Sequence, residues 1–66
     1  MFNVIGCLGI TVATTDSIDK VIHSVLSQIP LGNKKIRTLR NALSRLTTGQ
    51  KYHVEYGHSG CTIERL

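Results

Sequence analysis

Residues 17–46, SIDKVIHSVLSQIPLGNKKIRTLRNALSRL, decide the fold, because two helix-like patterns follow one another there with a short break between them. In the first half, apolar side chains recur at spacings of three and four residues. They are Ile18, Val21, Ile22, Val25, Leu26 and Ile29. Such a stripe is typical of an amphipathic helix that packs on a core. The sequence therefore predicts a helix over residues 17–29, with Val25 and Leu26 in the core.

A second helix is predicted over residues 34–46, after a break at residues 30–33 (PLGN) that leaves Asn33 as the N-terminal cap. Its apolar stripe is narrower than that of the first helix. The stripe consists of Ile36, Leu39, Leu43 and Leu46. Basic side chains occupy the opposite side of the helical wheel, so we expect this helix to bury one face and expose a cationic one.

The segment before the helices, residues 2–14 (FNVIGCLGITVAT), alternates between apolar and other side chains, which predicts one strand. Its apolar face would consist of Phe2, Val4, Leu8, Ile10 and Val12. Gly6 and Gly9 interrupt the pattern and mark positions for a bulge or a close backbone approach.

Two more strands are predicted after the helices, over residues 51–56 and 61–65, with a turn at residues 57–60. The expected cross-strand pairs are Tyr56 with Cys61 and Val54 with Ile63, because this register gathers apolar side chains on one face. The element order then predicts an α+β fold, β-α-α-β-β, with a three-stranded sheet and both helices packed on one face.

Length and composition narrow the possible classes of protein. A chain of 66 residues is expected to form a single domain over residues 1–66. Apolar residues make up 41% and charged residues 18%, which is typical of a folded domain. No apolar run reaches the ~18 residues of a membrane span, and no basic residue precedes the apolar N-terminal segment. We therefore expect a cytoplasmic protein with no membrane partner.

The distribution of charge is the clearest functional signal. The chain contains eight Lys and Arg residues but four Asp and Glu residues. The stretch between Asp19 and Glu55 holds seven basic residues and no acidic one. A helix with a cationic face can bind phosphates along a nucleic-acid backbone. The candidate nucleic-acid-binding residues are Lys34, Lys35, Arg37, Arg40, Asn41 and Arg45. The cations would contact phosphates, and Asn41 would reach a base edge.

These features predict a small, basic, non-catalytic binding module, a nucleic-acid-binding regulator that acts as a homodimer. Dimerisation is expected because the outward positions of the first strand, Ile5, Cys7 and Ala13, carry no charge that would discourage pairing. The alternative is a protein-interaction module of the phage or mobile-element accessory type. In that case the basic helix meets an acidic partner protein, or a sheet edge extends a partner's sheet.

Catalytic and metal-binding groups are not expected from the spacing of the reactive side chains. His53, His58 and Cys61 fall close together and Cys7 could join them, but His53 is predicted on the face opposite Cys61, and no Cys-x-x-Cys pair occurs. Two cysteines are too few for a disulfide framework. Ser59 follows His58 in a turn, where neighbours do not form an oriented nucleophile and base. We predict no catalytic residue, no metal and no cofactor.

Overall fold

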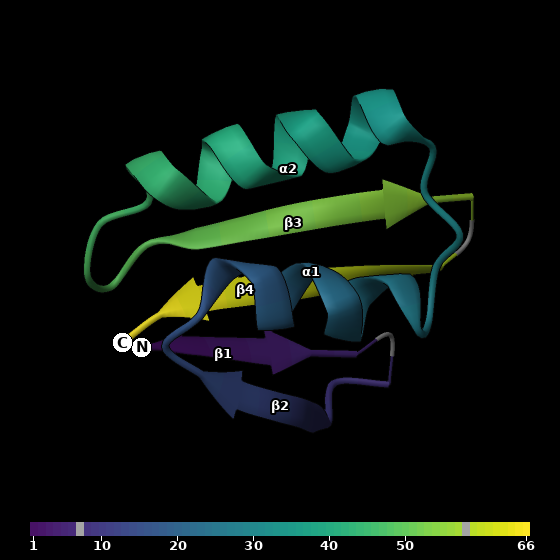
Figure 1. Ribbon diagram of the computed structural model, residues 1–66. Coiled ribbons are helices and arrows are strands. Elements are labelled where there is room, and N and C mark those ends of the chain that lie inside the picture. Colours follow the sequence, from purple (N-terminus) through teal and green to yellow (C-terminus); the bar gives the residue numbers. More distant parts are fainter. Residues whose placement is uncertain (7, 58) are drawn as a thin grey trace.

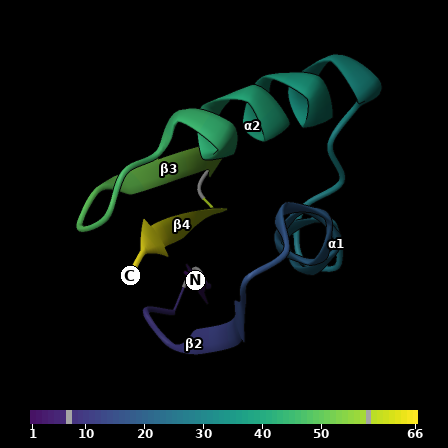
Figure 2. The same ribbon diagram turned by 60° about the vertical axis from the view of Figure 1, so that its left-hand side comes forward.

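Four strands and two helices make up the structure, a computed structural model that describes residues 1–6, 8–57 and 59–66. In chain order they are β1 (Phe2–Ile5), β2 (Thr11–Thr15), α1 (Ile18–Leu26), α2 (Asn33–Arg45), β3 (Lys51–Tyr56) and β4 (Ser59–Arg65). The strands form one antiparallel sheet in the order β2-β1-β4-β3 (Figure 1). Both helices lie on the same face of this sheet, as the edge-on view shows (Figure 2). The α+β class is confirmed.

The predicted three-stranded sheet is wrong, because residues 2–14 form a hairpin and not one strand. The Gly6 N–H donates to the Ile10 carbonyl oxygen at 2.9 Å, and the Gly9 N–H donates to the Gly6 carbonyl oxygen at 3.0 Å. Gly9 adopts a φ of +77°, which glycine reaches without steric cost. The chain therefore reverses within the predicted strand and supplies both β1 and β2.

This hairpin changes which side chains of the segment are buried. Leu8, Ile10 and Val12 were expected in the core, but their side chains are 83%, 64% and 49% exposed. Val12 is the extra residue where the β1–β2 register shifts, because Val4 pairs with Ala13 and Ile5 pairs with Thr11. Ala13 packs against the core and does not lie on the open face. Cys7, predicted on the outward face of the strand, lies outside the described residues.

The core lies between the helices and the sheet and draws on five of the six elements. Its buried members are Phe2, Val4, Val21, Ile22, Val25, Ile29, Leu39, Leu43, Leu46, Val54, Cys61 and Ile63. Val25 is fully buried as predicted, whereas Leu26 is only half-buried at the margin of the core.

The hairpin of β3 and β4 differs from the predicted register by two residues. Val54 pairs with Cys61 and Tyr52 pairs with Ile63, because Gly57 adopts a φ of +57° and permits a tighter turn. A shift of two residues preserves the faces of both strands, so the same side chains still point to the core. His58, predicted as an exposed turn residue, lies outside the described residues.

Both helices are found where the apolar stripes predict them, but α1 is shorter than predicted and α2 begins and ends one residue earlier. The Ser17 hydroxyl caps α1 by accepting a hydrogen bond from the Lys20 N–H at 3.4 Å, and the helix ends at Leu26. Asn33 is the first residue of α2 and not its cap, which is Gly32. Among the described residues, no helix combines the length and the apolar character needed to cross a membrane.

Candidate nucleic-acid interface

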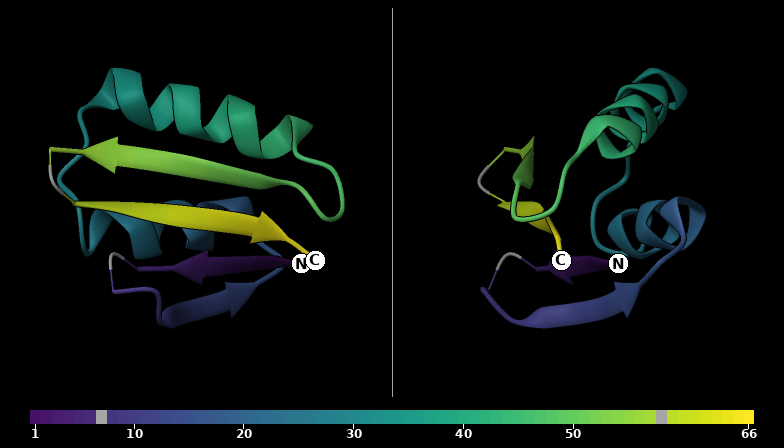
Figure 3. Two further views of the ribbon diagram at one scale, coloured as in Figure 1. Left: turned by 180° about the vertical axis from the view of Figure 1, so that it is seen from behind. Right: turned by 90° about the vertical axis from the view of Figure 1, so that its left-hand side faces the viewer.

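The helix α2 lies at the β3 end of the molecule, far from β2, and one of its sides faces away from the rest of the chain (Figures 1 and 3). Leu39 and Leu43 hold it to the core, where they are 2% and 0% exposed. Because these two residues define the inward side, a helical period of ~3.6 residues places the opposite side in solvent. The packing that anchors α2 therefore also exposes its polar face.

Four of the candidate residues form a line along this outward side. They are Lys34, Arg37, Asn41 and Arg45, which we call the outward row. All four are exposed, and they follow one another at spacings of three, four and four residues. At ~1.5 Å per residue, the row extends over about 16 Å of the helix. Three cations and one amide thus project from a single ridge.

Arg40 lies apart from the outward row, on the side of α2 that faces α1. Its guanidinium forms an ion pair with the Asp19 carboxylate of α1. Asp19 thereby neutralises one cation of α2 and ties the two helices together. Because both side chains are exposed, the pair stabilises the fold only modestly.

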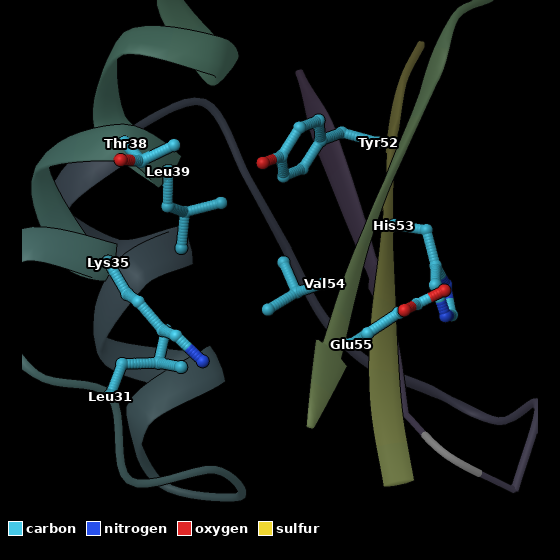
Figure 4. A pocket seen from close by; sticks show the side chains of 8 residues that line it. All are labelled: Leu31, Lys35, Thr38, Leu39, Tyr52, His53, Val54 and Glu55. Carbon is cyan, nitrogen blue, oxygen red and sulfur yellow. The ribbon is translucent and has the colours of Figure 1, made fainter. Parts of the chain in front are cut away.

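Lys35 lies on the other flank of α2, beside a groove between α2 and β3 (Figure 4). Tyr52 and Val54 point from β3 towards the helix, whereas His53 and Glu55 point to the other face of the sheet. The groove has a volume of about 220 Å³, room for one or two side chains. The candidate residues are thus divided among the outward row, the α1 contact and this groove.

A polar hollow of about 350 Å³ continues the outward row past the C-terminal end of α2. It is lined by Ser44, Arg45, Leu46, Thr47, Thr48 and Arg65. The Arg65 guanidinium donates to the Leu46 carbonyl oxygen at 3.0 Å and lies 5.2 Å from the centre of the Phe2 ring. These two contacts hold Arg65 in place. The guanidinium groups of Arg45 and Arg65 therefore border the same hollow, together with the hydroxyls of Ser44, Thr47 and Thr48.

Sequence reasoning missed Arg65 because its position depends on strand pairing. The Gly49 N–H donates to the Arg65 carbonyl oxygen at 2.7 Å, and the Arg65 N–H donates to the Gln50 carbonyl oxygen at 3.0 Å. These bonds bring the end of β4 to the segment that leaves α2. No local pattern in the sequence signals such a contact between distant segments.

The side chains considered for a metal site are not gathered in the described part of the chain. His53 lies on the open face, where its Nδ1 is 3.0 Å from the Thr62 hydroxyl, and Cys61 is buried on the helix side. Cys7 and His58 lie outside the described residues. In the ranges that the structure describes, no three His, Cys, Asp or Glu side chains are grouped so that they could hold a metal ion.

Comparison of the chain with models of known protein families, with curated protein sequences and with solved structures gave no match. The chemistry of the surfaces described above is therefore the guide to function. Of these, the outward row combines the highest density of cations with full access from solvent.

Proposed function

We propose that the protein is a small non-catalytic nucleic-acid-binding module, and that the outward row of α2 contacts the phosphate backbone. The observation that supports the proposal is the placement of Lys34, Arg37 and Arg45 on one solvent-facing ridge. Within the described residues, the ion pair of α2 involves Arg40, so these three cations are available to an external anion. Such a module acts as a regulator in the cytoplasm, where nucleic acid is accessible.

The shape of the ridge suits a nucleic-acid duplex. An α-helix with its side chains is ~10–12 Å across, which matches a major groove ~12 Å wide. Cations along the ridge contact phosphates, and Asn41, between Arg37 and Arg45, has an amide that can pair with an adenine edge. The hollow bordered by Arg65 accommodates one further phosphate at the end of the row.

The test is the effect of one charge reversal inside the row and one outside it. Arg37→Glu lowers affinity for duplex DNA at low salt at least tenfold, because it removes a phosphate contact and adds a repulsive charge. Lys20→Glu on α1 changes net charge equally but leaves the row intact, so its affinity stays close to that of the wild type. Fluorescence anisotropy against random duplex, single-stranded DNA and RNA measures both.

Two results would contradict the proposal. One is a wild-type protein that binds none of these nucleic acids at low salt, where electrostatic affinity is greatest. The other is an equal loss of affinity in both variants, which would assign binding to net charge and not to α2. Salt dependence gives a further check, since the slope of log affinity against log salt becomes shallower by ~0.9 for each phosphate that a variant no longer neutralises.

A protein-interaction function is the second candidate, and the groove beside Lys35 favours it. β3 lies at the edge of the sheet, so an extended peptide can pair with its free backbone groups while its side chains enter the groove. Lys35 would select an acidic peptide. Lys35→Glu should then abolish peptide binding while Arg37→Glu does not, the reverse of the pattern expected for nucleic acid.

A further inference from the structure

Three large apolar side chains are exposed together at the β1–β2 turn. Leu8, Ile10 and Val12, with Gly6 and Gln28, line a hollow of about 180 Å³ whose surface is almost entirely apolar. Single exposed apolar residues are common on monomers, whereas a contiguous group around a hollow is typical of a contact surface. We call this group, Leu8, Ile10 and Val12, the apolar turn patch.

The patch adjoins β2, which is an edge strand of the sheet. Among the described residues β2 pairs with β1 alone, so the backbone groups along its outer side are open to a further strand. Its sequence, TVATT, contains no charged residue and no proline. The other edge strand, β3, carries the charged residues Lys51 and Glu55. The two edges of the sheet thus differ in the charge that they present to another strand.

The sequence of β2 is complementary to itself. In an antiparallel pair centred on Ala13, Thr11 faces Thr15 and Val12 faces Thr14, so every flanking pair joins two uncharged β-branched residues. Such pairs stabilise antiparallel strands. Val12 belongs both to β2 and to the apolar turn patch, so the same pairing covers part of the hollow.

The distribution of charge also favours a second copy at this edge. Each chain has a net charge of +4, so two copies repel unless their cations are distant from the contact. The cationic helix α2 lies at the β3 end of the molecule, opposite β2 (Figure 1). The acidic Asp16 directly follows β2. The β2 edge is therefore where two copies approach with the least repulsion.

We infer that the β2 edge and the apolar turn patch form a homodimer interface that joins two four-stranded sheets into one. The two-fold axis of an antiparallel strand pair is perpendicular to the sheet, so the helices of both copies lie on the same face. The contact is isologous, because the same residues are used on both sides. The assembly is therefore complete with two chains. Backbone pairing provides the register, and the patch contributes apolar burial.

Light scattering of the full chain over a range of micromolar concentrations, without nucleic acid, tests the inference. The wild type should have the mass of two chains. Leu8→Glu introduces a charge into the patch at a position 83% exposed, so it leaves the fold intact and raises the dimer dissociation constant at least tenfold. Val12→Lys places a charge on the edge itself and should have the same effect. Circular dichroism reports whether each variant is folded.

Leu66→Lys is the matched control, because Leu66 is an exposed apolar residue, 53% exposed, at the opposite end of β1 from the turn (Figure 1). It should retain the mass of two chains. A wild type with the mass of one chain at every concentration would overturn the inference. So would a dimer that Leu8→Glu leaves intact, or one that Leu66→Lys alone disrupts. Because no nucleic acid is present, these results are independent of the proposed function.

Discussion

Leu43 has no exposed surface and holds α2 to the sheet, whereas Leu26 on α1 keeps part of its side chain in water. We predict that Leu43→Ala lowers the free energy of unfolding by ~2–5 kcal/mol, since a cavity remains where the side chain was. Leu26→Ala should cost clearly less. Urea denaturation of both variants measures the difference, and equal losses would contradict the burial described here.

Single residues also show which parts of the site follow from the sequence. The outward row could be predicted, because residues spaced three and four apart on a helix share a face whatever the helix packs on. The partners of Arg40 and Arg65 could not. Asp19 reaches Arg40 only because α1 and α2 pack side by side, and Arg65 reaches Leu46 only through the pairing of β4.

At the scale of elements, turns account for the main errors. The alternation of residues 2–14 is compatible with one long strand, and only the conformation of Gly9 shows that the chain reverses. The register of β3 and β4 follows likewise from Gly57. The alternation of side chains along a strand defines which face is buried. It does not define the length of the strand, and it cannot distinguish two registers that differ by two residues.

The β3–β4 turn depends on the positive φ of Gly57. Gly57→Ala should lower the free energy of unfolding by ~1–2 kcal/mol, because an L-residue with a side chain is strained at a φ of +57°. Gly57→Asn is the control, since asparagine tolerates this conformation better than other residues with a side chain. Thermal or urea unfolding compares the two, and a fully stable alanine variant would mean that the turn has a different conformation.

At the scale of the whole molecule, the proposed nucleic-acid contact and the inferred dimer contact lie at opposite ends of the sheet. A dimer would present two outward rows, so a long duplex could engage both while a short one engages a single row. We predict that Leu8→Glu weakens binding to long duplexes but not to short ones, because it removes the second contact and its high effective concentration. Anisotropy with two duplex lengths measures this, and an equal effect on both would contradict it.

The α+β class was predictable because the two helices follow one another along the chain and strands lie before and after them. The helices over Ile18–Leu26 and Asn33–Arg45 and the final hairpin all lie where their patterns predict. The number of strands and their neighbours were not predictable in the same way. The number of strands depends on the chain reversal at Gly9, and the order of the strands depends on the contact between β1 and β4, which joins segments far apart in sequence.

That central contact also has a kinetic consequence. Phe2 pairs with Arg65 and Ile5 with Thr62, so the middle of the sheet forms only when nearly the whole chain has closed into a loop. The two hairpins and the two helices involve near neighbours and can form early, but none is stable alone. The entropy cost of loop closure therefore opposes the pairing of β1 with β4 during folding. Refolding should be slower than in a helical bundle of this size, with the β1–β4 seam as the last region to acquire protection from hydrogen exchange.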